Sequence, residues 1–419
     1  MTVRGTIIWL ICAFFFLYEF FLRTVLGTFQ SSIILDLHLS AVQFAIMSST
    51  AYQIIYGLMQ LPVGIIADRY GLKKTLLFAA LVCSVSNLGF SFVHNYQMAL
   101  LFRLFMGLGS SFGFVCLLLA VYDWLPRKNI AFFIGLSQFI GTLGPMLAAG
   151  PLNALLETNV LGWRELFLVL ALIGGIFSIL VFCFVDKNRE EANSLFILAR
   201  PSSLLSNLYQ LVRQKQVWWI GFYSSSVYFS LEYLSENEGI SFLMAKGHSA
   251  TFAAYLITIA WLGYAIGCPV LGFLSDKLKQ RKPSMLFSIG LVLFSLSAII
   301  YLPLNPLSIL LCFFLLGIGA SGQSLGFAII SEYCQSSYLT IGLAFNNTLI
   351  MFFGAVSAPL ISTMLERGAT AYPLLVNYQM NFSLMIAFIF IGVILSFLLI
   401  KETFCKQVHE ITMLSPKLD

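Results

Sequence analysis

The sequence predicts an all-α membrane protein of twelve transmembrane helices, arranged as two pseudo-symmetric bundles of six. Its composition is the first reason, since 59% of the 419 residues are hydrophobic and only 10% are charged. Soluble domains carry about 25% charged residues. Apolar runs long enough to cross a bilayer, which takes about 20 residues, recur along the whole chain. A charged hairpin also occurs twice, half a chain apart.

The apolar runs form two groups of six, separated by the one long polar stretch of the chain. They lie at residues 6–28, 43–66, 75–93, 98–122, 130–154 and 165–185, and at 217–239, 251–274, 284–303, 307–331, 339–363 and 379–400. We therefore predict an N-terminal six-helix bundle over 1–185, a linker over 186–215, a C-terminal bundle over 216–401 and a tail over 402–419.

The linker contains a segment with helical, amphipathic spacing. It begins at Pro201, and its apolar residues recur on one helical face: Leu204, Leu205, Leu208, Leu211 and Val212. We expect this helix to lie along the inner membrane surface.

The distribution of basic residues predicts the orientation of the chain. If both termini lie inside, eighteen of the twenty-three Lys and Arg residues fall in cytoplasmic segments, three fall outside and two lie within helices. Because short cytoplasmic segments of membrane proteins are enriched in these residues, we expect both termini to be cytoplasmic. In a bacterial cell this places the multi-pass protein in the inner (plasma) membrane.

The two halves of the chain repeat one another. The hairpin GIIADRYGLKK over 64–74 recurs as GFLSDKLKQRK from Gly272. The segment 16–24 aligns with 229–237, which pairs Glu19 with Glu232, and 105–113 aligns with 315–323. Parallel six-helix repeats of this kind are typical of secondary transporters, whose substrate site lies near the bilayer midplane between the halves.

The first hairpin resembles the signature loop between helices 2 and 3 of the major facilitator superfamily, through Gly64, Asp68, Arg69, Gly71 and Lys73. The second copy resembles the weaker loop that the family has between helices 8 and 9. RLFMGLGSSFG, from Arg103, is similar to the family's helix-4 motif, and Gly144-Pro145 to a motif common in antiporters. The resemblance implies the twelve-helix fold and transport by alternating access.

Four of the charged residues within predicted spans stand out: Glu19, Arg23, Arg103 and Glu232. Each costs roughly 2.5–3.5 kcal/mol to insert, so such residues usually serve a function. Our hypothesis is that Arg23 and Arg103 bind a carboxylate, which suits the planar guanidinium. Glu19 or Glu232 would then carry the proton, because burial raises a carboxylate's pKa.

Structural alternatives remain open for these charges. Glu19 and Arg23 are four residues apart, so they could form an ion pair on one helical face that only locks the helix in place. Arg103 could pair with a backbone carbonyl while the neighbouring glycines permit close helix packing.

Other polar side chains within the spans are candidates for contact with the substrate, although each alone could simply join helices. They are Tyr18, Tyr52, Tyr56, Gln138, Asn346 and Asn347. Charged and glycine residues of the inner loops are candidates for a gate, with ordinary positive-inside anchoring as the alternative. They are Gly64, Asp68, Arg69, Gly71, Lys73, Asp123, Arg127, Gly272, Asp276 and Arg281.

Several classes of function are disfavoured. The sequence has no phosphate-binding loop of the Walker type and no motif pairing a nucleophile with a base, so we expect no enzyme and no cofactor. The eight cysteines include no CxxC pair, which disfavours a metal site. The net charge of +5 is small for this length and does not favour nucleic acid. The expected partners are a small solute, protons and the lipid bilayer, with the protein as a monomer.

The stretch YEFFLRT, together with MQLPVGIIADRYG, resembles superfamily members that take up organic anions and amino acids, including the phagosomal nutrient transporters of intracellular pathogens. We therefore predict proton-coupled symport of a small carboxylate-bearing solute, such as an amino acid, an organic acid or a carboxylate siderophore. The alternatives are proton-driven efflux of a drug or siderophore, and a membrane receptor that kept the fold and lost transport.

Overall fold

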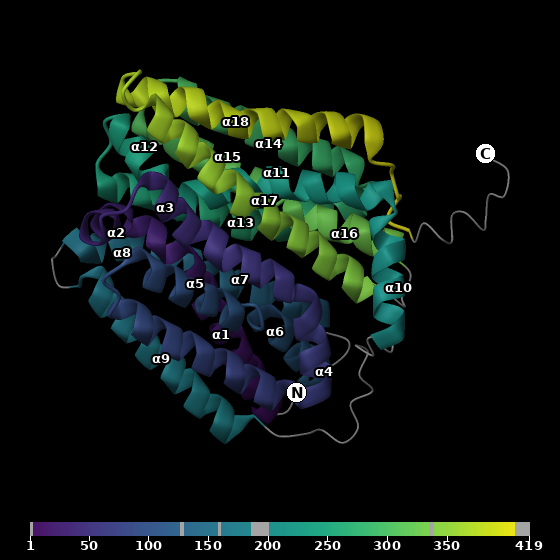
Figure 1. Ribbon diagram of the computed structural model, residues 1–419. Helices are drawn as coiled ribbons and strands as arrows, with labels where there is room; N and C mark the ends of the chain where they lie inside the picture. The colour runs from purple at the N-terminus through teal and green to yellow at the C-terminus, as the bar shows by residue number, and fades with distance from the viewer. Residues whose placement is uncertain (1–2, 126–129, 158–160, 186–200, 335–338, 407–419) are drawn as a thin grey trace. The chain divides into compact units, whose positions relative to one another are not determined.

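The computed structural model describes residues 3–125, 130–157, 161–185, 201–334 and 339–406, and these are helices and short connections without a strand (Figure 1). The first half of the chain forms α1 (Val3–Thr28), α2 (Gln30–Leu37), α3 (Ala41–Ala45), the π-helix η1 (Ile46–Thr50), α4 (Ala51–Ser91), α5 (Tyr96–Ser110), α6 (Gly113–Trp124), α7 (Ile130–Ala148), α8 (Gly150–Glu157) and α9 (Trp163–Phe184).

The second half begins with α10 (Pro201–Val212), where the sequence predicted an amphipathic helix. It continues with α11 (Lys215–Glu236), α12 (Gly239–Ala245), α13 (Ala250–Leu278), α14 (Lys282–Tyr301), α15 (Pro306–Ala320), α16 (Gln323–Tyr333), α17 (Leu339–Gly368), α18 (Leu374–Ile394) and the π-helix η3 (Leu395–Leu399). Most of the predicted linker, residues 186–200, lies outside the described residues.

Eleven of the described helical segments are long and apolar enough to cross a membrane. Each corresponds to one predicted span, and the remaining span, 217–239, forms α11. Polar residues lower the mean hydropathy of α11, among them Ser224, Ser225, Ser226, Ser230 and Glu232. Residues 223–240 are nevertheless buried without exception, so protein surrounds this part of α11. The predicted all-α, twelve-helix fold is confirmed.

The internal repeat is visible in local structure. α5 begins at Asn95, whose side chain accepts a hydrogen bond from the backbone N–H of Met98, and α15 begins in the same way at Asn305 with Ser308. Both helices end at a pair of glycines whose carbonyls accept from the following cap residue, and a second helix then continues the span. Equivalent capping and equivalent breaks agree with a duplicated six-helix unit.

The chain packs as two compact units. Unit 1 contains residues 1–197, 232–258 and 354–378, and unit 2 contains 198–231, 259–353 and 379–419. Helices α11, α13, α17 and α18 therefore each contribute one end to unit 1. These units divide the chain differently from the domain boundaries at 185 and 216, which remain a prediction.

Gly71 interrupts the long helix α4 between two membrane spans. Its backbone has φ 76° and ψ 164°, a conformation that is essentially restricted to glycine. In the second hairpin the position equivalent to Gly71 is Lys279, whose φ is also positive at 53°. Gly272 is equivalent to Gly64 and lies inside α13 with open space around the position of a Cβ. Both copies of the repeated loop thus contain a residue with positive φ at the same position, and this residue is a glycine in the first copy.

We expect Gly71→Ala to lower the free energy of unfolding by about 1–3 kcal/mol, because alanine is strained in this backbone conformation. Gly272→Ala is the matched control, and its higher helix propensity should leave stability unchanged or raise it slightly. Thermal unfolding of the purified protein in detergent measures both. A Gly71→Ala protein as stable as the control would contradict the assigned conformation.

Candidate functional site

A buried arginine on α1 is held by two glutamates on α11. Arg23 is only 6% exposed, and its guanidinium pairs with Glu232 and with Glu236. The Nε atom donates to Oε1 of Glu236 at 2.8 Å. Glu232 and Glu236 are four residues apart, so one turn of helix presents both carboxylates to the same guanidinium. All three residues belong to unit 1.

A ring of polar side chains surrounds Glu236. Gln53 of α4 donates from Nε2 to Oε2 of Glu236 at 2.9 Å, and Ser49 of η1 donates to the same oxygen at 3.3 Å. Asn237, the next residue, donates to Ser49 and accepts from Ser48 at 2.8 and 2.7 Å. Glu236 is therefore fixed by several hydrogen bonds in addition to its ion pair.

Glu19 lies on the same helix as Arg23 and contacts Tyr52. The Tyr52 hydroxyl donates to the backbone carbonyl of Glu19 at 3.0 Å and lies 3.3 Å from its Oε2. Glu19 also packs against Gly113 of α6, where a Cβ would lie 2.9 Å from Glu19 Cγ. The carboxylate thus occupies a space that a larger residue at position 113 would restrict.

Arg103 of α5 is fully buried and donates only to uncharged acceptors among the contacts resolved. The Arg103 Nη2 atom donates to the backbone carbonyl of Ser48 at 2.7 Å, and its Nη1 atom donates to the backbone carbonyl of Leu22 at 2.9 Å. The guanidinium stacks on the Tyr52 ring, 4.7 Å from its centroid. These contacts agree with the structural alternative stated for Arg103, since the side chain ties α5 to α1 and η1.

The five buried charges of this cluster do not balance. Glu19, Glu232 and Glu236 are acids, and Arg23 and Arg103 are bases, so the fully ionised cluster has a formal charge of −1. A net charge in a water-excluded site is costly unless it is neutralised. The formal charges alone therefore leave one carboxylate of the cluster without a basic partner.

Three of the other predicted substrate residues also belong to unit 1, and their surroundings differ. Tyr18 donates from its hydroxyl to the carbonyl of Leu170 at 2.8 Å, Tyr56 stacks on Tyr52, and the Gln138 side chain is exposed. Asn346 and Asn347 belong to unit 2, where Asn346 is fully buried and Asn347 half-buried. Their roles in substrate binding stay predictions.

Sequence reasoning missed Glu236, although a signal for it was present. The residue lies within the predicted span 217–239, one turn after Glu232, which is the spacing that places two carboxylates on one helical face. It also aligns with Arg23 in the repeat 16–24 and 229–237. Two acids four residues apart on one predicted helix are therefore a signal for a shared basic partner.

The outer ends of the second-half helices pack onto the first half within unit 1. Glu238 accepts hydrogen bonds from Nε2 of Gln30 at 2.6 Å and from the hydroxyl of Tyr378 at 3.0 Å. The backbone N–H of Gly150 donates to Thr258 at 2.9 Å. The predicted orientation places these contacts on the outer side, where they hold the helix ends together.

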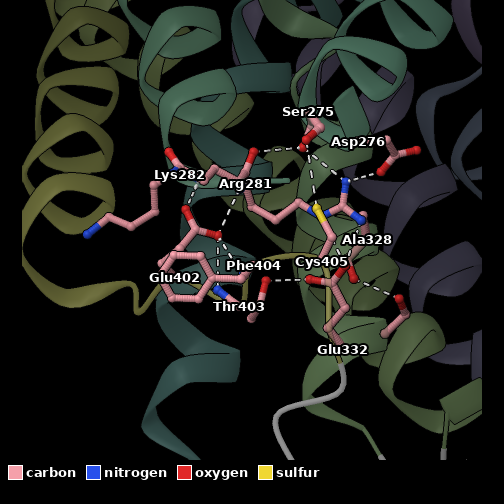
Figure 2. A network of polar contacts seen from close by, with 12 residues as sticks. Ser275, Asp276, Arg281, Lys282, Ala328, Glu332, Glu402, Thr403, Phe404 and Cys405 are labelled. Atoms are coloured by element: carbon pink, nitrogen blue, oxygen red, sulfur yellow. Dashed lines mark hydrogen bonds and ion pairs between the residues drawn. The ribbon is translucent and has the colours of Figure 1, made fainter. Parts of the chain in front are cut away.

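A second charged network lies in unit 2, at the ends of α13, α14 and α16 (Figure 2). Arg281 donates from Nη2 to Glu332 Oε1 and from Nη1 to Asp276 Oδ1, both at 2.6 Å. Burial alone would lower the pKa of Arg281, but its hydrogen bonds to Glu332 and Asp276 outweigh burial and raise that pKa. Arg281 therefore stays charged over the physiological pH range.

Residues 402–405, which follow η3, contact this network (Figure 2). The Glu402 carboxylate accepts from the backbone N–H groups of Arg281 and Lys282, each at 2.8 Å, and so caps the start of α14. Thr403 donates to Glu332, and the Cys405 thiol donates to the carbonyl of Ser275 at 3.7 Å. Residues 402–405 thus join three helix ends.

We expect Glu402→Ala to lower the free energy of unfolding by about 0.5–2 kcal/mol, because it removes the side-chain cap of α14. Lys401→Ala is the control, since the Lys401 side chain is exposed and the residue bonds mainly through its backbone. Thermal unfolding in detergent measures the difference. Equal stability of the two variants would contradict a capping role for Glu402.

The predicted gating residues of the first half have varied surroundings. Lys73 donates to the carbonyl of Phe182 at 2.6 Å, and the Arg69 guanidinium lies 5.5 Å from the ring centroid of Tyr70. Gly64 is within α4, and Asp123 is near the end of α6. Arg127 and the side chain of Asp68 lie outside the described part of the chain. A gating role for these residues stays a prediction.

Two six-helix repeats with buried charges define the class of this protein as a multi-pass membrane transporter. The comparison with protein families agrees, because the model described as Major Facilitator Superfamily matches residues 9–245 and 239–404. The chain belongs to the Major Facilitator Superfamily, so transport, and not catalysis, is the activity that its fold and family indicate. The resemblance inferred from the signature loop is thereby confirmed.

The chain is similar to several transporters of organic acids. It is 27% identical to the hexuronate transporter of Bacillus subtilis over 269 residues, which cover 62% of each chain. It is 24% identical to the sialic acid transporter NanX of Escherichia coli, over 72% of this chain and 73% of that one. The aligned part thus spans about three fifths of the hexuronate transporter.

Solved structures show the same fold. A bacterial homologue of the human lysosomal transporter Spinster, in an inward-facing and occupied conformation, superposes with a TM-score of 0.74 at 16% identity, covering 95% of this chain and 97% of that one. The nucleoside transporter NupG superposes with a TM-score of 0.73 at 13% identity, covering 95% and 100% of the two chains.

Proposed function

We propose that the protein is a proton-coupled symporter that imports a small carboxylate-bearing solute, with organic acids of the sugar-acid type as the first candidates. The observation that carries the proposal is the buried Arg23 with its two carboxylate partners, Glu232 and Glu236. The names of two relatives, transporters of hexuronate and sialic acid, favour an acidic solute. We place the protein in the inner (plasma) membrane with both termini cytoplasmic.

Charge balance explains how the solute and the proton would be coupled. In our scheme the solute carboxylate takes the place of a glutamate on Arg23, and an ionised glutamate left buried without its partner costs about 3–5 kcal/mol. Protonation of the displaced glutamate removes this cost. Proton and anion then each strengthen the binding of the other, which is the reciprocal linkage that symport needs.

Glu236 and Glu232 are the proton acceptors in this scheme, and Glu19 is the third carboxylate that a proton could reach. Arg23 is the residue that binds the solute carboxylate, because a planar guanidinium can donate two parallel hydrogen bonds to the two carboxylate oxygens. Arg103 holds α1, η1 and α5 together and supplies positive charge beside Tyr52. A direct contact between Arg103 and the solute stays a prediction.

Uptake into proteoliposomes with acid outside tests the proposal, across a panel of hexuronates, other organic acids, amino acids and a carboxylate siderophore. Symport predicts that one acidic solute accumulates against its gradient and that accumulation stops when the proton gradient is dissipated. Accumulation that is indifferent to the proton gradient contradicts proton coupling. Release of preloaded solute or drug under the opposite gradient, without uptake, would replace import by efflux.

A further inference from the structure

A groove with hydrocarbon walls lies between α1, α7 and α9 of unit 1 and has a volume of about 550 Å3. Its walls include Ile7, Phe14 and Phe21 of α1, Leu147 of α7, and Val169 and Phe177 of α9. The one polar side chain in the walls is Tyr18, whose hydroxyl already donates to Leu170 and accepts from Asn87. The groove therefore suits an apolar ligand.

The groove lies on the side of α1 that faces away from the charged cluster. With about 100° of rotation per residue, the face containing Ile7, Phe14 and Phe21 is opposite the face containing Glu19 and Arg23. The groove is also open, since Phe14 and Leu147 are each 47% exposed and Val169 is 41% exposed. It is thus distinct from the proposed solute site.

The surroundings of the groove are the hydrocarbon of the bilayer. All three helices that line it are candidate membrane spans. From Ile7 to Phe21 the groove follows α1 for about 21 Å, at 1.5 Å per residue. This is longer than half of the roughly 30 Å hydrocarbon core, so one extended acyl chain can lie along it.

The end of the groove near Ile7 carries a basic residue. Arg4 is exposed and precedes Ile7 by one turn of α1. The distribution of basic residues predicts that this end of α1 is cytoplasmic, where anionic lipid headgroups attract basic side chains. A headgroup phosphate near Arg4 and an acyl chain beside Phe14 would satisfy both parts of the site.

We propose that the groove between α1, α7 and α9 binds one acyl chain of an anionic phospholipid from the cytoplasmic leaflet, with its phosphate beside Arg4. The chain fills the space between α1 and α9 and supports the back of the helix that carries Arg23. The inference goes beyond the proposed function, because it assigns the protein a specific lipid.

Native mass spectrometry of the full-length protein, purified in mild detergent and offered phosphatidylglycerol or phosphatidylcholine, tests the proposal. Val169→Trp fills the groove and should reduce retained phosphatidylglycerol about tenfold, as a loss of about 1.4 kcal/mol of binding would. Leu172→Trp is the matched control, because Leu172 is on the same helix, 70% exposed and outside the groove. It should retain as much lipid as the unchanged protein.

Val169→Trp could also lower lipid retention by distorting the helix packing, so two further variants that remove side-chain atoms are tested. Phe14→Ala removes chain contacts from the opposite wall and should also lower retention. Arg4→Ala should lower retention of phosphatidylglycerol about fivefold and that of phosphatidylcholine less, because phosphatidylcholine has the phosphate but no net charge. Full retention in both Val169→Trp and Phe14→Ala, or equal losses in both tryptophan variants, overturns the acyl-chain site. Equal effects of Arg4→Ala on the two lipids overturn the preference for an anionic headgroup.

Discussion

Replacing Arg23 with alanine is expected to abolish accumulation of the acidic solute in proteoliposomes. The variant loses the only guanidinium that pairs with Glu232 and Glu236 in the described cluster, and two buried carboxylates remain. Losing the guanidinium of a buried charge pair with the solute costs about 2–5 kcal/mol of binding, so initial uptake should fall about a hundredfold. Uptake driven by a proton gradient, acid outside, measures the loss.

A loss of uptake could also follow from a loss of folding, so the experiment needs a second variant. Arg23→Gln combined with Glu236→Gln removes charges of both signs and should recover most of the thermal stability, but not transport. Arg164→Ala is the control for an arginine outside the site, where Arg164 pairs with Asp36 at 2.8 Å and is partly exposed. Normal transport by the double variant would refute solute binding by Arg23.

Glu236→Gln is expected to separate binding from coupling. Glutamine keeps the hydrogen bonds from Gln53 and Ser49 but cannot exchange a proton. The variant should therefore still exchange labelled for unlabelled solute across the membrane at equal pH, while accumulation driven by the proton gradient falls at least about tenfold. Paired assays of exchange and accumulation on one preparation measure both.

Glu238→Gln is the matched control for this experiment. Glu238 is also a buried carboxylate, two residues further along the chain, but it is bound by Gln30 and Tyr378. The control should retain gradient-driven accumulation. If Glu236→Gln accumulates solute as well as this control, the coupling proton belongs to another carboxylate, and Glu232→Gln and Glu19→Gln are then the variants to compare.

Much of the fold could be predicted from the sequence because hydropathy and the repeat both act over long stretches. Even α11, whose mean hydropathy is too low to qualify as a span by composition, was predicted as the apolar run 217–239. The break at Gly71 matched the signature loop. The π-helix η1 was not predicted, since an extra residue in a helical turn leaves no periodic signal.

The site was only partly predictable, because ion-pair partners depend on which helices pack together. Glu19, Arg23 and Glu232 were recognised as costly charges, but the sequence suggested Glu19 as the partner of Arg23, whereas the structure pairs Arg23 with Glu232 and Glu236. Arg103 was recognised for the same reason. Its acceptors are backbone carbonyls of α1 and η1, which no side-chain pattern reveals.

The polarity of α11 also has a consequence for the order in which the protein is made. Each charge on a membrane span costs about 2.5–3.5 kcal/mol on insertion scales, so α11 with two glutamates enters a bilayer poorly by itself. The N-terminal part of a chain is synthesised first, so Arg23 is already in the membrane when Glu232 and Glu236 emerge. A first half expressed alone would contain Arg23 without these glutamates. The two halves are therefore interdependent during biogenesis.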